Sequence, residues 1–477
     1  MIKQLIHTSI GAACLALVVT ACKTPALVTR TESREVPAGY TASLDSTNSG
    51  ALSWREFFTD PHLTGLIETA LKNNQELAIS LQEIDIARNE IRARQGEYLP
   101  FVGLRGGVGE DKASRYTLPG ASVAATEIRP GKHTPDPLPN LSGGVVATWE
   151  LDIWHRLRNA KKAALNRYLA SVEGRNFAIT NLVAEIAGSY YELLALDNEL
   201  EIVRQTIDLQ TSALRVIRIQ KEAAKVSELA VRRFEAQVLN TQNLQYGIRQ
   251  RMVEAENRVN FLTGRFPQPE VRRSEEFNQR MPATVQAGVP AQLLVNRPDI
   301  RRAEQELLAT KLDVKVAKAR FYPTLGISAG IGLQAFNPAY LLKAPESLIL
   351  SLAGELAGPL INKNAIIAAY NSANARQIQA VYNYERAILN AYIEVANQLS
   401  RIKNFEKSYE VKAKEVQALT QSVAISNTLF NSARADYMEV LLTQRDAQES
   451  RFDLVETRKQ QLNAMISLYR ALGGGWK

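Results

Sequence analysis

The sequence is poor in the residues from which catalytic and metal sites are built. It contains two cysteines and four histidines in 477 residues. His7 lies in the N-terminal segment, and His62, His133 and His155 fall in unrelated segments. No HExxH or CxxC spacing occurs, so we expect no zinc site. The glycine-rich stretch from Gly103 to Gly109 is not followed by the Lys-Ser/Thr pair of a phosphate-binding loop. These absences argue against an enzyme and against a bound cofactor.

Both cysteines lie near the N-terminus, where the sequence has the features of an export signal. Lys3 supplies a positive start, and the apolar stretch 10–19 is too short to stay in a bilayer as a helix. Small residues then precede Cys22, as in the bacterial lipobox. We expect cleavage after residue 21 and acylation of Cys22 by S-diacylglycerol and N-acyl groups. Cys14 would leave with the signal, so the mature chain could form no internal disulfide. The alternative is a signal peptide without lipidation.

Long apolar runs and a strong charge bias are also missing. No run of about 18 apolar residues follows the signal, so transmembrane helices are not expected. Any membrane crossing would then require a closed β-barrel. The net charge is +8, and loss of Lys3 with the signal leaves +7. Basic and acidic residues are mixed along the chain, which does not indicate a nucleic-acid partner.

The rest of the chain consists of two similar halves. Each half contains a short segment, Gly96 to Pro100 or Ala319 to Pro323, that precedes a glycine-containing stretch in which apolar and polar residues alternate. The two halves also end with similar sequences, at 259–264 and at 468–473. The segment between them is rich in proline and polar residues and is typical of a connector. The predicted organisation is a signal peptide at 1–21, a lipidated arm at 22–60, a first repeat at 61–264, a connector at 265–297 and a second repeat at 298–477.

Each half is predicted to contain two β-strands, at about 100–152 and about 323–356. Apolar residues alternate there with small or polar ones, which places them on one face of a strand. Lengths near ten residues suit tilted transmembrane strands. The residues 111–140 between the first two strands are expected to form a long exposed loop, and the residues 334–346 a shorter one. A soluble hairpin in each half remains the alternative.

Each half is also predicted to contain two very long helices, at 159–264 and at 361–472. Apolar residues recur with a mean step close to 3.5, the spacing of coiled coils. Proline is absent from 159 to 266 and from 360 to the end, as uninterrupted helices require. A helix over 159–223 would be roughly 100 Å long. The helices are expected to turn near 225–228 and near 434–436.

Four strands cannot close a barrel, because bacterial outer-membrane barrels have at least about eight. An open sheet would leave unpaired backbone groups in the lipid, so the strands must belong to a barrel shared between chains. A ring of protomers meets this need. Counting alone leaves two or three protomers possible.

The mature chain resembles the TolC-like outer-membrane efflux proteins, and within them the lipoprotein branch called NodT-like. The motifs that carry the resemblance are Trp54-Arg55-Glu56-Phe57-Phe58, Asp60-Pro61, Arg297-Pro298-Asp299-Ile300, Tyr322-Pro323, Leu356-Ala357-Gly358-Pro359-Leu360 and the C-terminal Leu468-Tyr469-Arg470-Ala471-Leu472-Gly473-Gly474-Gly475-Trp476. The resemblance implies a mainly α fold with a transmembrane β-barrel: a homotrimer with a twelve-stranded barrel, a periplasmic helical barrel and a mixed equatorial domain. It implies a passive exit duct in the outer membrane of a Gram-negative bacterium. The partners would be a periplasmic adaptor and an inner-membrane RND-type pump.

The same resemblance suggests a gate where the helices turn. The gate candidates are Asp436, Met438, Glu439 and Arg445, and the adaptor-contact candidates are Ser227 and Glu228. Acidic rings formed by Asp436 and Glu439 would favour cations and close through linkages to Arg445. Many relatives have an acid where this chain has Leu442, so a hydrophobic constriction is also possible. An ordinary solvated helix face explains the same charges.

Two other functions remain open at this point. A periplasmic coiled-coil lipoprotein with a structural role would explain Cys22 and the helices, but not the four alternating segments. The outer duct of a type I protein secretion system would share the whole architecture. The sequence does not indicate the transported substrate, which we expect the pump to select.

Overall fold

The computed structural model describes residues 24–40, 47–272, 277, 285–432 and 434–477. The predicted signal peptide, 1–21, and Cys22 lie outside these residues. The described chain divides into two compact units. Unit 1 comprises residues up to Thr31, Asp85–Leu169 and Gln305–Val381, and unit 2 comprises Glu32–Ile84, Ala170–Glu304 and Tyr382–Lys477. Each predicted repeat therefore contributes to both units.

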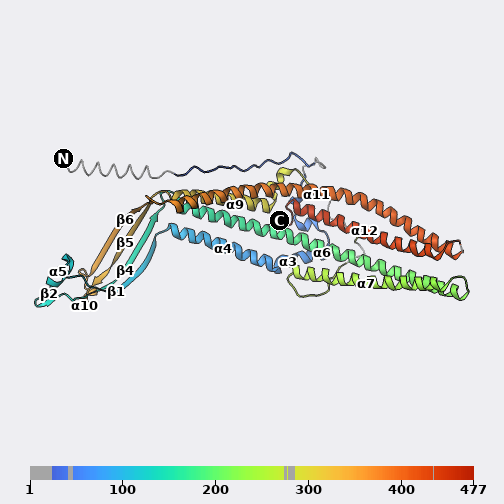
Figure 1. The fold of residues 1–477 in the computed structure, drawn as a ribbon, viewed down its shortest axis with the longest axis horizontal. Helices are drawn as coiled ribbons and strands as arrows, with labels where there is room; N and C mark the ends of the chain where they lie inside the picture. The colour runs from blue at the N-terminus through green and yellow to red at the C-terminus, as the bar shows by residue number, and fades with distance from the viewer. Residues whose placement is uncertain (1–23, 41–46, 273–276, 278–284, 433) are drawn as a thin grey trace. The chain divides into compact units, whose positions relative to one another are not determined.

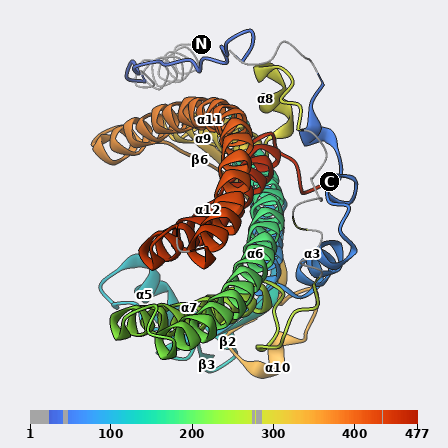
Figure 2. The ribbon, with the colours of Figure 1, turned by 90° about the vertical axis from the view of Figure 1, so that its right-hand side faces the viewer.

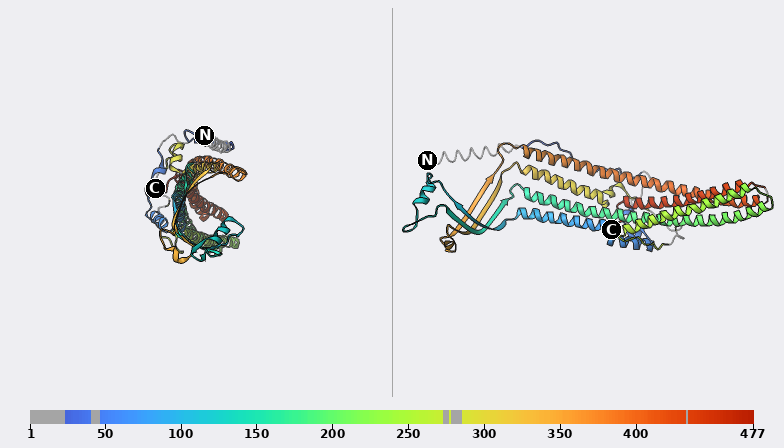
Figure 3. Two further views of the ribbon diagram at one scale, coloured as in Figure 1. Left: turned by 90° about the vertical axis from the view of Figure 1, so that its left-hand side faces the viewer. Right: turned by 60° about the horizontal axis from the view of Figure 1, so that its bottom comes forward.

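Unit 1 contains a four-stranded antiparallel sheet with the strand order β1-β4-β5-β6 (Figure 1). The strands are β1 (Phe101–Asp111), β4 (Leu138–Leu151), β5 (Thr324–Ala335) and β6 (Leu348–Ala357). They cover the four segments in which apolar residues alternate in the sequence. The two strands of the first repeat lie beside the two strands of the second, and Figure 3 shows all four side by side.

The register of the sheet aligns the apolar residues of the four strands. Leu104 pairs with Val145, Val145 with Ile331, and Ile331 with Leu350. Directly paired residues of an antiparallel sheet point to the same face. The parallel row two residues away is Val102, Ala147, Ala329 and Leu352. One face of the sheet is therefore apolar across its whole width.

The opposite face brings β4 and β5 unusually close together. Gly144 pairs with Gly332 in the register. A Cβ atom built on Gly144 would lie 2.5 Å from the Ile331 carbonyl oxygen and 2.6 Å from the Gly332 Cα. The contact therefore leaves no room for a side chain at Gly144, whereas a Cβ on the adjacent Gly143 meets no atom within 4 Å.

The connections between the strands are more ordered than the sequence suggested. The expected loop 111–140 contains α5 (Leu118–Ala125) and a small hairpin of β2 (Glu127–Arg129) and β3 (Lys132–His133). Thr117 caps α5 by accepting a hydrogen bond from the Gly120 N–H at 3.4 Å. The exposed loop predicted there therefore contains short elements of its own, which the sequence did not indicate because local caps and a tight turn, rather than a long apolar pattern, define them. The shorter loop between β5 and β6 contains α10 (Pro338–Leu341).

The predicted long helices are present. In the first repeat they are α6 (Arg156–Glu222) and α7 (Glu228–Leu262), and in the second α11 (Asn364–Asn431) and α12 (Tyr437–Ala471). The first helix of each pair has nearly the same length, 67 residues for α6 and 68 for α11. The second helix, α7 or α12, has 35 residues in both pairs. The two repeats therefore agree in their helix lengths as well. None of the described helices has a stretch long and apolar enough to span a membrane.

Two further helices precede the strands and were missed in the sequence. They are α4 (Gln75–Tyr98), which leads to β1, and α9 (Pro298–Ala319), which leads to β5. Only Leu77 and Ile84 of α4 are buried, so this helix lacks the apolar stripe that identifies an amphipathic helix. The predicted connector also contains helical turns, η3 (Pro290–Gln292) and α8 (Leu293–Asn296).

The main hydrophobic core of unit 2 joins the N-terminal motif to the long helices. The short elements η1 (Ser49–Ala51) and α2 (Trp54–Phe57) are followed by α3 (Pro61–Asn73). Phe57 is fully buried and stacks on Tyr469 of α12, with ring centroids 4.1 Å apart. The Tyr190 hydroxyl of α6 donates to Asp60 at 2.9 Å. The aromatic motif at residues 54–58 therefore fixes α6 and α12 in one core.

The close approach of β4 and β5 leads to a stability prediction. Gly144→Ala should destabilise the protein by about 1–3 kcal/mol, the usual cost of overpacking a site that cannot expand. Gly143→Ala is the matched control, and its effect should stay within about 0.5 kcal/mol. The midpoint of thermal unfolding in detergent measures both. Equal midpoints for the two variants would show that the backbones can separate without cost.

Candidate functional site

The two faces of the sheet differ in chemistry, and this difference is the first functional feature. The apolar face is strongly exposed in the single chain: Leu104 is 88% exposed and Leu352 is 81% exposed. The opposite face carries glycine and polar residues, such as Ser142, Thr148 and Ser351. A soluble sheet buries its apolar face against other parts of the protein. This sheet instead presents its apolar face outward, as a surface that contacts lipid does.

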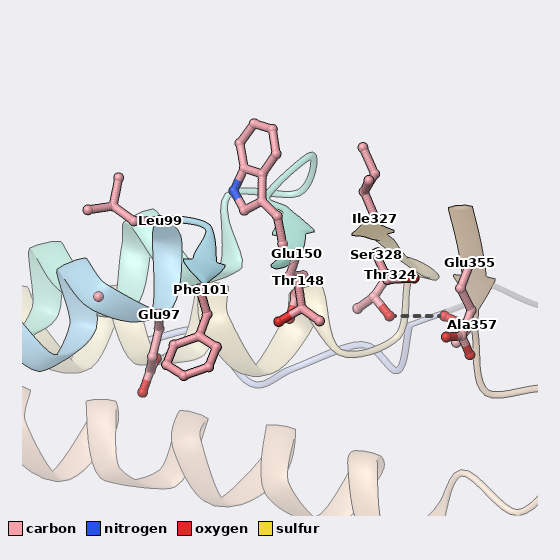
Figure 4. Close-up of a pocket in the computed structure, with 13 residues that line it drawn as sticks. Glu97, Leu99, Phe101, Thr148, Glu150, Thr324, Ile327, Ser328, Glu355 and Ala357 are labelled. Carbon is pink, nitrogen blue, oxygen red and sulfur yellow. Dashed lines mark hydrogen bonds between the residues drawn. The ribbon is translucent and has the colours of Figure 1, made fainter. Parts of the chain in front are cut away.

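The polar face ends in a hollow of about 720 Å³ at the base of the strands. Figure 4 shows Phe101, Thr148 and Glu355 on one side of the sheet and Ile327 on the other. Glu150 also lines the hollow, and it accepts two hydrogen bonds of 2.7 Å from the Arg156 guanidinium. The hollow is open and lined by strand ends, which is the surface expected for the inside of a water-filled conduit.

The turns of the long helices form the second functional feature, in unit 2. The α6–α7 and α11–α12 pairs are two helical hairpins (Figure 2). Their ends pack together in a cluster that we call the tip cluster, which includes Leu214, Ile217, Phe234, Val440 and the partly buried Phe430. Val440 of the second hairpin is 1% exposed. The tip cluster therefore holds the two hairpins of one chain together next to their turns.

The gate candidates lie at the start of α12, beside the tip cluster. Asp436 is the N-cap residue of α12, but its side chain makes no capping hydrogen bond. Asp436, Glu439 and Arg445 are exposed, and Met438 is half-buried. The Met438 sulfur lies 2.6 Å from Nη1 of Arg233 on α7. Within one chain the structure therefore brings the candidates to one helix end and leaves their carboxylates exposed.

Within the single chain, Arg445 pairs with a neighbouring residue of α12. Arg445 donates to Asp446, with its Nη2 2.9 Å and its Nε 3.1 Å from Oδ1, and not to Glu439. Asp446 is the next residue along the helix. Leu442 is 43% exposed, which leaves its side chain available to line a constriction.

The adaptor-contact candidates lie at the other turn. Ser227 is the N-cap residue of α7 and makes no side-chain capping bond. Glu228 bridges the turn, with 2.9 Å contacts to Lys221 of α6 and to Arg232 of α7. The hydrogen bond and charge of Lys221, followed by Arg232, hold the pKa of Glu228 below its usual value. Glu228 therefore stays ionised at neutral pH and stabilises the turn.

The structure contains no arrangement that suggests catalysis among the residues it describes. No group of three or more His, Cys, Asp or Glu side chains there could hold a metal ion. The sequence Gly326-Ile327-Ser328-Ala329-Gly330 matches the GxSxG pattern of hydrolases, but it lies inside β5. A nucleophile elbow requires a sharp strand-to-helix turn, so this serine is a strand residue of the polar face.

Comparison with known proteins assigns the family. The pattern of a family described as "outer membrane efflux protein" matches residues 66–265 and 289–474. The chain belongs to the outer membrane efflux protein family. It is an efflux channel of the outer membrane, and the family consists of transport ducts rather than enzymes. The predicted fold class, long helices combined with a small sheet of strands, is confirmed by the solved relatives described next.

Curated relatives extend over nearly the whole length of the chain. The solvent efflux pump outer membrane protein SrpC of Pseudomonas putida is 27% identical over 88% of this chain and 87% of its own length. The cation efflux system protein CusC of Escherichia coli is 26% identical over 97% of this chain and 98% of its own length. Two solved structures have the same fold. A membrane protein from Pseudomonas aeruginosa gives a TM-score of 0.85 at 22% identity, with 94% of this chain and 100% of that chain covered. The open MtrE channel of Neisseria gonorrhoeae gives 0.83 at 22% identity, with 95% and 99% covered.

The motif around Arg297 in this efflux protein has a structural role that the sequence did not reveal. Arg297 is 4% exposed and forms a forked pair with Asp299, at 2.7 and 3.0 Å. It also donates to Glu394 of α11 and to the Ala471 carbonyl at the end of α12, both at 2.8 Å. Although its burial opposes the charged form, these carboxylates raise the pKa of Arg297. One buried guanidinium therefore joins the connector, α11 and the C-terminal end of α12.

The N-terminal arm of the efflux protein lies along the long helices in an extended form. In unit 1, Asn374 of α11 donates to the Val28 carbonyl at 2.9 Å, and Leu27 packs against the buried Phe321 and Tyr370. In unit 2, Arg34 pairs with Glu304 at 2.8 Å. The stacked rings of Tyr40 and Tyr392 have centroids 5.4 Å apart. The arm is therefore bound to the helices from its first described residues onward.

Proposed function

We propose that this efflux protein works as a homotrimeric, lipid-anchored exit duct of a tripartite system. Three chains would contribute four strands each to one twelve-stranded barrel, as the resemblance to the TolC-like channels implies. The observation that carries the proposal is the sheet: its apolar face is exposed, and the outer edges of β1 and β6 pair with no strand among the described residues. Pairing β6 of one chain with β1 of the next would satisfy both edges, as head-to-tail rings do.

The helices of unit 2 support the same assembly. On α7, the exposed apolar residues Leu239, Tyr246 and Val253 are spaced by seven residues. On α11, Tyr382, Leu389 and Ile393 are 52%, 58% and 45% exposed. Apolar residues at this spacing form the seam between neighbouring helices in coiled coils. A second copy of the chain would cover both stripes, whose side chains are exposed in the single chain.

Assembly and conduction can be tested with one pair of variants. Leu389→Asp places a charge in the α11 stripe, and Asn390→Asp places the same charge one residue further along, about 100° around the helix. We expect a trimeric native mass and ion-conducting openings in planar bilayers for the wild type and for Asn390→Asp. Leu389→Asp should lose most of the trimer, because an unpaired carboxylate would be buried. A wild-type protein that is monomeric or dimeric and never conducts would overturn the proposed function.

We further propose that the start of α12 is the constriction of the duct. Asp436 and Glu439 are exposed carboxylates at the helix turn, and three copies around an axis would form acidic rings. In the trimer Arg445 would link neighbouring chains at the closed tip, in exchange for its contact with Asp446. Ser227 and Glu228 would lie at the companion turn, where the periplasmic adaptor docks.

The constriction predicts a change in conductance. The double variant Glu439→Ala with Arg445→Ala should give larger single-channel currents and weaker cation preference than the wild type, since both the acidic ring and its linkage are removed. Glu449→Ala, at an exposed position further along α12, is the control and should leave both quantities unchanged. Identical currents for all three proteins would place the constriction elsewhere.

The lipid anchor is a separate part of the proposal. The arm, described from Thr24 onward, is bound along unit 1, and the lipobox cysteine lies two residues before Thr24. Several acyl chains on Cys22 would hold the protein stably at a membrane, at roughly 0.8 kcal/mol per buried methylene. Mass spectrometry of the mature N-terminus should show a triacylated cysteine in the wild type and none in Cys22→Ser. An unmodified Cys22 would contradict the anchor and leave the duct unaffected.

We propose the class of transported compounds from the names of the relatives. The names of the relatives assign solvents to SrpC, toluene to TtgI, cations to CusC and pyoverdine to OpmQ. These substrates favour a passive route for small molecules or metal ions, expelled by an RND-type pump through an adaptor. Nothing in the geometry of this chain favours protein secretion over this route.

A further inference from the structure

A second hollow in unit 1 has a lining of opposite charge to the acidic tip. It measures about 490 Å³ and lies among α6, α9 and α11. Three arginines line it, one from each helix or its end: Arg167, Arg320 and Arg376. Asp313 is the acidic residue of the lining. Three guanidinium groups thus meet a single carboxylate around one space.

The three arginines are not equivalent. Arg167 is held by Asp313 and lies 3.7 Å from Glu306, so its orientation is fixed by carboxylates of α9. Arg320 and Arg376 are exposed, and the described residues offer neither of them a carboxylate within ion-pair distance. Like charges that face one hollow repel each other unless an anion lies between them. The hollow therefore has an unbalanced positive charge.

The shape of the hollow suits a small anion. Its lining includes the small side chains of Ala317, Ser372 and Ala373, which allow a ligand to approach the helix backbones. The volume falls in the range of about 300–1,000 Å³ that is usual for small-molecule sites. The planar fork of a guanidinium matches the oxygens of a phosphate and can bind two of them at once.

The hollow opens on a different side of α11 from the arm. Asn374 binds the arm through the Val28 carbonyl, and Arg376 comes two residues later. Their side chains therefore leave the helix about 200° apart. If the arm lies outside the wall of the duct, the arginines face the inside, where exported solutes pass. This step rests on the proposed function.

We propose that Arg167, Arg320 and Arg376 form a binding site for phosphate-bearing anions, with one site in each chain. Arg320 and Arg376 bind the phosphate oxygens, and Arg167 is positioned by Asp313 at the edge of the site. The anion comes either from an exported solute or from a phospholipid headgroup. In the duct, such a site would concentrate anionic solutes.

Titration calorimetry on the full-length protein in detergent tests the site, with inorganic pyrophosphate as the probe. We expect saturable binding, one ion per chain, that weakens with added salt. The double variant Arg320→Gln with Arg376→Gln should bind roughly tenfold more weakly or not at all, because two charge-assisted contacts are lost. The variant Arg215→Gln with Arg249→Gln removes the same charge from exposed positions of α6 and α7 and should bind like the wild type.

A charge-conserving variant distinguishes a specific binding site from a general electrostatic attraction of anions to positive charge. Arg320→Lys with Arg376→Lys keeps both charges but lacks the planar forks, so its affinity should fall between those of the wild type and the glutamine variant. Equal affinities for the wild type and the glutamine variant, or no saturable binding by the wild type, would overturn the site.

A second probe distinguishes the two sources of the anion. Dihexanoyl phosphatidylglycerol, a water-soluble phospholipid, should compete with pyrophosphate if the site accepts lipid headgroups. Pyrophosphate binding without competition assigns the site to soluble anions. Conductance of the same preparation tests the proposed duct independently of the anion site. Channels that conduct but bind neither probe would contradict the anion site and leave the proposed duct unaffected.

Discussion

The structure depends on one constraint: the chain cannot satisfy the backbone hydrogen bonds of its own sheet. Four strands leave the outer edges of β1 and β6 unpaired, and the apolar residues on one face prevent these edges from remaining in water. Burial in lipid without pairing would cost several kcal/mol for each backbone group. Pairing between copies removes both costs at once. This constraint is the physical reason for the ring of chains that we propose.

The same constraint explains the glycines of the sheet. Gly144 and Gly332 face each other where β4 and β5 approach too closely for side chains, and this contact lies on the polar face. Removing side chains from one face lets that face become concave, while the long residues of the apolar face spread apart. Curvature of this kind is what a sheet needs in order to become part of a barrel.

The sequence predicts the elements whose pattern is periodic, and it misses contacts made by the folded chain. The strands followed from alternation at Leu104, Val145 and Ile331, because a sheet with one lipid-facing face must alternate. Helix α4 was missed because only Leu77 and Ile84 are buried, so no stripe marks it. The motif at Arg297 was recognised only as a resemblance. Its partners Glu394 and Ala471 are 97 and 174 residues away, and only the fold brings them together.

The distribution of charge argues that different parts of the duct interact with different ions. Exposed carboxylates at Asp436 and Glu439 occupy the helix turns, whereas arginines surround a hollow in unit 1. A narrow acidic ring at the proposed constriction would act on every ion that passes, because no ion could avoid its field. An arginine site beside a lumen through which ions can pass without contact would act only on ions that bind it, since salt screens its field within about 10 Å. Cation preference in conductance and affinity for phosphate can therefore coexist in one channel.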